Sequence, residues 1–202
     1  MKHDENSTRE NLVAATVKLL DTVSLEEINA TMVLAATGSS KSSLYHFFED
    51  FSDLLEHAFL ARFEASVRAS DVAIKEIIQR SQSVEDFYDA LDQITQMSQE
   101  RNRSAIRFER ARALARSERS DRFRQALGVI QQQLTDSLTE AFAMAQAKGF
   151  LNTSFEPRTG AVLIQAYTLG RIVDDITTTH MNDQDWNQLI SRIMRLALGK
   201  TE

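Results

Sequence analysis

The sequence predicts an all-α protein of nine helices, with a small amino-terminal three-helix unit and a larger helical unit. Three observations predict this class. Apolar residues recur at helical spacing in almost every segment, and no segment alternates apolar and polar residues as a half-buried strand does. The 202 residues include one proline and six glycines, as expected where long helices dominate. Residues 37–48, TGSSKSSLYHFF, place a glycine turn between two short helices.

Caps and apolar spacing predict the first two helices. Ser7, followed three residues later by Glu10, indicates a capping box that opens the first helix. The inner face of this helix carries Leu12, Ala15, Leu19 and Leu20. The second helix has two possible caps, either Ser24 with Glu27 or Asn29 alone. Asn29 is preferred because it leaves a short helix of about seven residues before the glycine turn.

The next four helices follow from similar signals. Ser40 is the expected cap of the third helix, and Asp50 opens a long fourth helix that ends near Ile78. Because its first turns belong to the small unit and the rest to the larger one, this helix is the expected connector. Ser83 opens a fifth helix, and residues 102–116 form a sixth.

The last three helices have clear boundaries. Ser120 begins a long, glutamine-rich seventh helix that Gly149 ends. Pro157 fits the first turn of an eighth helix, because a helix leaves the first backbone N–H groups unbonded. Asn182 caps a ninth helix, which runs to Gly199.

Composition limits the function classes. The chain has no cysteine, which excludes disulfides, thiolate nucleophiles and cysteine zinc sites. The first residues are polar and do not form a signal peptide. The sequence contains no run of about 18 apolar residues, so no membrane span is predicted. We therefore expect a soluble, cytoplasmic protein without a membrane partner. The net charge is −6, and the first 60 residues hold four basic residues against ten acidic ones. Few phosphates can be neutralised by so acidic a segment.

Catalysis has little support in the sequence. The four histidines, which lack metal-ligand spacing, are His3, His46, His57 and His180. No glycine-rich phosphate loop is present. Asp174 and Asp175 are a carboxylate pair, but adjacent helical residues point to different sides. We expect neither an enzyme nor a metal site nor a cofactor.

The chain resembles the TetR family of transcriptional regulators. The resemblance rests on Gly38, Leu44, Tyr45 and Phe48, which fall where the family pattern has them, with Leu54 just beyond. The resemblance is strongest over residues 9–55. It implies a helix-turn-helix DNA-binding domain at 1–50 and a ligand-binding and dimerisation domain at 51–202. It further implies a homodimeric repressor that a small molecule releases from a palindromic double-stranded operator. The alternative is a helical small-molecule-binding or scaffold protein of the same fold that has lost operator binding.

The resemblance also implies a set of DNA-contacting residues, which are Thr31, Lys41, Ser42, Ser43, Tyr45 and His46. Leu44 and Phe48 are expected to face inward and to hold the recognition helix. Three positions depart from the family pattern. Phe51 stands where a phosphate-binding lysine is frequent, Ser24 replaces a usual glycine, and Thr31 replaces a residue that is frequently charged or long and polar. Binding is therefore expected to depend on a few hydrogen bonds and on dimer geometry.

The resemblance implies two further residue sets, both in the larger domain. The predicted dimer interface, from the last two helices, is Ile164, Thr168, Ile172, Trp186, Ile190, Ile193, Met194 and Ala197. The predicted lining of a pocket for a largely apolar effector is Phe87, Met97, Phe108, Phe142, Met144 and Tyr167. In both cases the alternative is an ordinary core face of one chain.

Residues 101–124 carry nine arginines against three acidic residues, which gives +6 in a chain of net charge −6. Arg103, Arg107 and Arg110 share a helix face by their spacing, and so do Arg112 and Arg116. Three functions are open for this stretch: binding an anionic ligand, pairing with the acidic amino-terminal helices, or docking on DNA. The fourth interpretation is a solvated face with local ion pairs.

Overall fold

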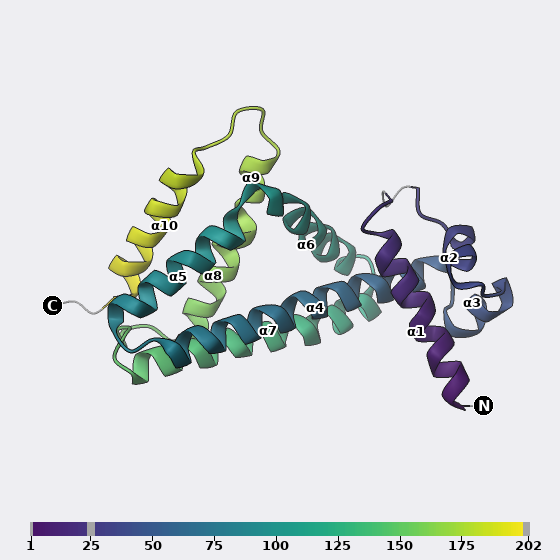
Figure 1. Cartoon of the computed structure of the whole chain (residues 1–202), viewed down its shortest axis with the longest axis horizontal. Helices are drawn as coiled ribbons and strands as arrows, with labels where there is room; N and C mark the ends of the chain where they lie inside the picture. Colours follow the sequence, from purple (N-terminus) through teal and green to yellow (C-terminus); the bar gives the residue numbers. More distant parts are fainter. Residues whose placement is uncertain (1, 24–26, 200–202) are drawn as a thin grey trace. The chain divides into compact units, whose positions relative to one another are not determined.

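The computed structural model describes residues 2–23 and 27–199, and all regular secondary structure in these ranges is helical (Figure 1). The predicted nine helices correspond to α1–α8 and α10 of the described chain, so the all-α prediction is confirmed. Two short segments, the four-residue α9 and the 3-10 helix η1, were not predicted. Contacts divide the chain into two compact units between Ser66 and Val67, inside α4. The functional boundary at residue 50 stays a prediction.

The first unit contains α1 (Lys2–Leu19), α2 (Ala30–Thr37), α3 (Lys41–Phe47) and the start of α4 (Phe51–Arg80). Asn29 caps α2 by accepting a hydrogen bond from Met32 N, which confirms the preferred cap; the alternative at Ser24 lies outside the described residues. Ser7 does not open α1, because the helix already begins at Lys2. No glycine or proline precedes Ser7, so nothing in the sequence stops the helix from extending there.

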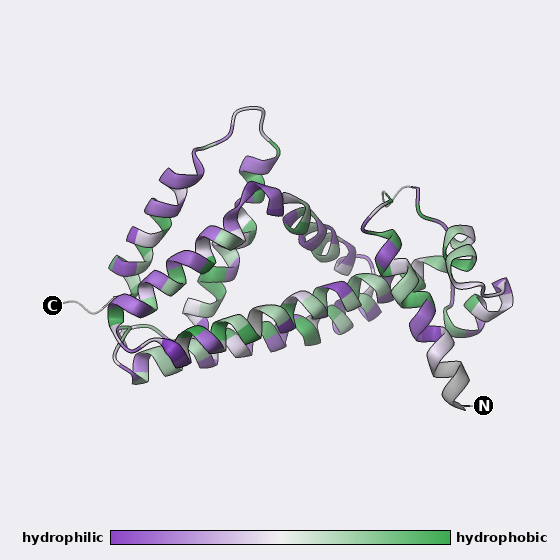
Figure 2. Cartoon of the chain, viewed as in Figure 1, coloured by the Kyte–Doolittle hydropathy of each residue, from purple (hydrophilic) through white to green (hydrophobic). Residues whose placement is uncertain are grey.

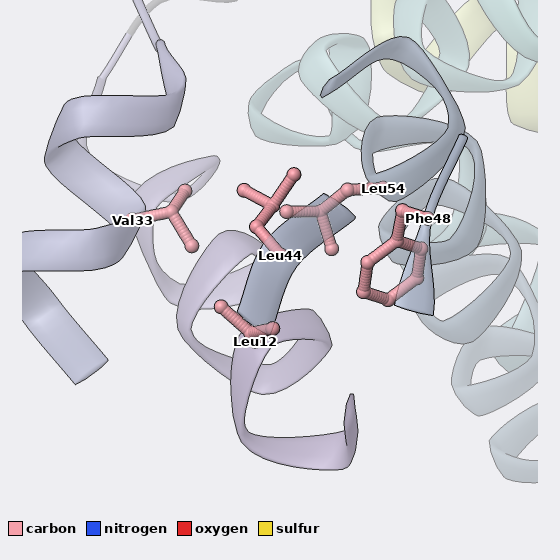
Figure 3. Close-up of a cluster of buried hydrophobic side chains, with 5 residues drawn as sticks. All are labelled: Leu12, Val33, Leu44, Phe48 and Leu54. Carbon is pink, nitrogen blue, oxygen red and sulfur yellow. The ribbon is translucent and has the colours of Figure 1, made fainter. Parts of the chain in front are cut away.

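A compact apolar cluster holds the helices of the first unit together. Leu44 of α3 lies between Val33 of α2 and Leu54 of α4, with Leu12 of α1 beside it (Figure 3). Phe48, directly after α3, is also buried. Each helix therefore contributes to one core, and the inward orientation expected for Leu44 and Phe48 is confirmed.

The second unit contains the rest of α4 and the segments that follow it. These are α5 (Val84–Gln99), η1 (Arg101–Arg103), α6 (Ser104–Ser117), α7 (Asp121–Ala147), α8 (Pro157–Gly170), α9 (Ile172–Asp175) and α10 (Asp183–Leu198). The predicted caps are confirmed at Ser83, Ser120 and Asn182, whose side chains accept backbone N–H groups. Pro157 stands at the start of α8, as predicted.

Helix packing in the second unit has three main seams, α8 along α7, α10 along α5 and α6 against α7. The first seam is close at Gly160, where an added Cβ would lie 2.9 Å from the Phe155 ring and 3.0 Å from the Phe142 ring. No helix within residues 2–23 and 27–199 combines the length and apolar character needed to cross a bilayer.

Candidate nucleic-acid interface

The turn between α2 and α3 is built by local hydrogen bonds and one glycine. Gly38 has φ 65°, in the left-handed region that glycine adopts most readily. The Thr37 hydroxyl donates to Val33 O at 3.0 Å and accepts from Ser39 N at 3.3 Å. The chain therefore leaves α2 in a fixed direction and enters α3 at Lys41, after the three residues 38–40.

Ser40 organises the start of α3. Its Oγ accepts from Ser43 N at 3.1 Å and lies 2.7 Å from the Ser42 hydroxyl and 2.9 Å from the Ser43 hydroxyl. This cap satisfies a backbone N–H that the first turn of the helix would otherwise leave unbonded. It also leaves Ser42 at the surface with a hydroxyl already oriented.

The outer face of α3 carries most of the predicted DNA-contacting residues. Lys41, Ser42, Tyr45 and His46 are exposed, as is Thr31 on α2. The remaining predicted residue, Ser43, is half-buried. Lys41 Nζ lies 5.8 Å from the centre of the Tyr45 ring, a cation–π contact one helical turn apart. The structure thus brings an ammonium group, two hydroxyls and an imidazole together on one helix face. Their contact with DNA stays a prediction.

A second group of side chains, which the sequence analysis did not identify, supports the end of α3. The Arg9 guanidinium lies 5.3 Å from the centre of the Phe48 ring, and its Nη2 lies 3.2 and 3.1 Å from the two ring nitrogens of His57. Phe48 also meets the His57 ring edge-to-face at 5.4 Å. His57 follows Asp53 by one helical turn and lies 3.6 Å from its carboxylate. The four-residue separation of Asp53 and His57 was the signal in the sequence from which this contact could have been predicted.

The unit that carries α3 is acidic in composition. Residues 1–66 hold five basic and eleven acidic residues, and Lys41 is the one lysine or arginine of α3. Phe51, which stands where the resemblance led us to look for a lysine, packs against the core cluster instead. This unit therefore has few cationic groups with which to neutralise DNA phosphates.

The six residues predicted to line an effector pocket lie in different environments. Phe87 and Phe142 are buried in ring contacts, the first with Tyr88 and Phe150 and the second with Phe155. The Tyr167 hydroxyl lies 3.2 Å from Thr95 Oγ1, and burial raises the pKa of this tyrosine. The other members differ in exposure: Phe108 is half-buried, whereas Met97 and Met144 are exposed.

This chain alone does not enclose Met97 and Met144, since their side chains lie on the outer faces of α5 and α7 and are 57% and 38% exposed. Their role as walls of an effector pocket stays a prediction. A pocket at the remaining positions stays a prediction.

The predicted dimer residues of α10 separate into two stripes. Ile190 and Met194, followed by Leu198, are buried in their own chain, where α10 packs on α5. Counting Ile190 and Met194 as interface residues was therefore wrong. Ile193 and Ala197 are exposed, as predicted for an interface, and Leu189 and Leu196 extend their stripe. Hydrophobic and hydrophilic residues alternate along α10 (Figure 2).

The other predicted dimer residues are half-buried, and these are Ile164, Thr168, Ile172 and Trp186. Trp186 Nε1 donates to Gln99 Oε1 at 3.2 Å, so this side chain is tied to α5 of its own chain. The exposed apolar residues near α8 are instead Val162, Leu163, Val173 and Ile176. These were not predicted.

One arginine of the basic stretch forms a buried ion pair. Arg107 Nε donates to Asp175 Oδ2 at 2.5 Å and Nη2 donates to Oδ1 at 2.7 Å, with both side chains almost fully buried. These hydrogen bonds lower the pKa of Asp175 below its ordinary value. The predicted common face with Arg103 does not form, because Arg103 lies in η1 and the chain becomes α-helical only at Ser104.

A second buried arginine connects neighbouring elements. Arg171 follows α8 and donates to Gln99 O and to the Asp183 carboxylate. The structure therefore uses charged groups inside the larger unit to join the ends of α5, α6, α8 and α10. No cluster of three or more metal-binding side chains occurs within the described ranges.

The helix order and the outward-facing helix after a glycine turn define an all-helical protein with an amino-terminal helix-turn-helix unit. No family model and no curated protein sequence matches the chain. Solved structures do.

A Mesorhizobium loti protein assigned to the TetR family of transcriptional regulators matches with a TM-score of 0.73 and 10% identity, over 97% of this chain and 98% of that chain. Escherichia coli NemR in its reduced form matches with a TM-score of 0.64 and 18% identity, over 96% and 100%. Salmonella enterica GusR matches with a TM-score of 0.67 and 19% identity, over 95% of each chain. The chain therefore has the fold of TetR-family regulators along almost its whole length.

Proposed function

We propose that this protein is a transcriptional regulator that binds double-stranded DNA through α3. One observation carries the proposal: α3 follows a glycine turn, turns Leu44 inward and exposes Lys41, Ser42, Tyr45 and His46 on its outer face. A recognition helix needs such a division, since one face must hold the helix on its unit while the other reaches base edges and phosphates. The fold shared with TetR-family regulators supports the same interpretation.

The binding experiment uses the full chain. Duplexes are selected by the protein from a random-sequence pool, and their affinities are measured by fluorescence anisotropy between about 50 and 200 mM salt. We expect enrichment of an inverted repeat whose half-sites lie about one helical turn, roughly 34 Å, apart. Affinity for it should fall steeply with salt. No enrichment and no binding to any duplex would contradict the proposal and favour a scaffold or small-molecule binder of the same fold.

We propose further that the protein acts as a homodimer through α10 and the α8–α9 segment. Leu189, Ile193 and Leu196 form an exposed apolar stripe on α10, spaced by four and three residues. Near α8, the most exposed apolar residues are Val173 at 69% and Ile176 at 71%. Exposed apolar residues gathered in this way commonly mark an interface between proteins. A two-fold dimer would also place two copies of α3 for a palindromic operator.

Ile193→Glu should separate such a dimer. A carboxylate without a partner in an apolar interface costs several kcal/mol, so the dimer dissociation constant should rise about a hundredfold or more. Sedimentation velocity over a concentration series measures this. The control is Gln188→Glu, an exposed position of the same helix, which should leave the dimer intact. A wild-type chain that sediments as a monomer, or a variant that dimerises as the wild type does, would contradict the interface.

We also propose that the regulator is a repressor released by a small, largely apolar effector bound in the second unit. Two features support this. The second unit continues from the first unit through one unbroken helix, α4. It also contains a polar pair in buried surroundings, Tyr167 with Thr95, that could orient a ligand. An effector that prefers a conformation with low operator affinity would shift the population away from DNA.

A further inference from the structure

Arginines cluster around the turn between α6 and α7. Arg112 and Arg116 belong to α6, Arg119 to the turn, and Arg122 to the first turn of α7. Glu118 N and Arg119 N donate to Ala115 O and Arg116 O, so the backbone keeps a helical course as far as Arg119. The spacing of four and three residues therefore places Arg112, Arg116 and Arg119 along one side. We call these four arginines the arginine turn.

Two charges of the arginine turn are not neutralised locally. Arg112 and Arg119 are exposed and have no ion-pair partner in the described part of the chain. The nearby Asp121 carboxylate bonds Arg124 instead, at 2.6 Å. Like charges on one side of a helix repel one another, and an anionic partner would offset that repulsion.

The chemistry of the cluster suits phosphate. A guanidinium is planar, always charged, and able to donate two parallel hydrogen bonds to phosphate oxygens. Several such groups along one side of a helix match the repeated charge of a nucleic-acid backbone better than they match a single small anion. The first unit has few such groups, since residues 1–66 hold five basic against eleven acidic residues and α3 has Lys41 alone.

We propose that the arginine turn is a second DNA-binding surface, which contacts backbone phosphates outside the bases that α3 reads. This inference rests on the proposed function. The arginine turn supplies affinity that does not depend on base sequence, whereas α3 supplies discrimination between sequences. In this proposal the acidic first unit recognises the sequence, and the arginines of the larger unit bind the phosphates.

The test compares two double variants of the full chain. Arg112→Gln with Arg119→Gln removes two exposed charges of the arginine turn. Arg80→Gln with Arg158→Gln is the control; it removes two exposed charges elsewhere in the same unit. Each protein is titrated with the selected duplex and with a random-sequence duplex between about 50 and 200 mM salt. Thermal unfolding of each protein is recorded in parallel.

The proposal predicts a smaller salt dependence for the arginine-turn variant. The slope of log affinity against log salt should fall by about 0.9 for each phosphate that the variant no longer neutralises. At about 0.15 M salt that slope corresponds to about fivefold weaker binding for each such phosphate. The decrease should be equal for the two duplexes, because phosphates carry no sequence information. The control should keep the wild-type slope. Arg112→Lys with Arg119→Lys should restore most of the slope, since the charge remains.

Other outcomes are distinguishable. If the wild type binds the selected duplex and the Gln variant keeps its slope, the arginine turn does not contact DNA, while the proposed function stands. A changed unfolding temperature with an unchanged slope would likewise overturn the inference and assign these arginines to pairing within the protein. If the wild type binds no duplex at any salt, the proposed function fails, and this inference fails with it.

Discussion

Replacing Asp175 by asparagine should lower the free energy of unfolding of the second unit by about 3–5 kcal/mol, because it leaves the buried Arg107 charge without its counter-ion. The other acceptors of Arg107 are the backbone oxygens of Ser98 and Glu100, at 3.4 and 3.3 Å. Neutral carbonyls do not compensate for a missing carboxylate at that depth. Urea unfolding at about pH 7, followed by fluorescence of Trp186, the single tryptophan, measures the decrease.

Asp121→Asn is the matched control. Asp121 forms an ion pair with Arg124 at 2.6 Å, but its side chain is 79% exposed. Solvent screening makes such a pair worth little, so the expected change is at most about 1 kcal/mol. Equal effects at the two positions would show that burial does not strengthen the Arg107–Asp175 interaction, contrary to this account.

The pH dependence of the Asp175 variant follows from the same ion pair. Hydrogen bonds from Arg107 hold the pKa of Asp175 below that of an unfolded chain. The pKa is lowered on folding, so the ionised carboxylate stabilises the folded state at any pH above the ordinary pKa of an aspartate, about 4. This stabilisation is lost as the pH falls through the lowered pKa of the folded state. The difference between wild type and Asp175→Asn should therefore be constant near neutral pH and shrink below about pH 4.

The second large effect is expected from Leu44→Ala in the first unit. Leu44 is fully buried between α1, α2 and α4. Its truncation removes apolar contact and leaves a cavity, which typically costs about 2–5 kcal/mol. Hydrogen exchange read by mass spectrometry should show faster exchange in α2 and α3, because these helices open more easily.

Tyr45→Ala is the control for Leu44→Ala. The neighbouring Tyr45 loses more atoms, but its side chain is 48% exposed. Exchange in α2 and α3 should then stay close to that of the wild type. If both variants exchanged equally fast, orientation of α3 by the Leu44 core would be contradicted.

Local signals in the sequence predicted most helix boundaries. The caps at Asn29, Ser40, Ser83 and Asn182 depend on one side chain and the backbone a few residues away, so spacing alone identifies them. The predicted start of α1 at Ser7 was wrong because this signal is also local. A capping-box pattern inside a helix looks the same in sequence as one at its start.

Pairing between distant segments could not be predicted. Arg107 and Asp175 are separated by 68 positions, and neither position carries a local sign of burial. In α10, apolar residues occupy two stripes, and the sequence does not say that Ile190 packs on α5 while Ile193 stays exposed. The outer face of α3 was predictable because its inner residues, such as Leu44, fit the spacing of the helix-turn-helix pattern.

The most direct test of the central claim is the discrimination of Lys41→Ala between the selected duplex and a random one. A side chain that contacts base edges contributes about 1–3 kcal/mol to discrimination, so the ratio of the two affinities should fall about tenfold. Lys18→Ala, which removes an exposed lysine of α1 in the same unit, should leave the ratio unchanged. If Lys41→Ala also leaves it unchanged, α3 does not read DNA and the account is contradicted.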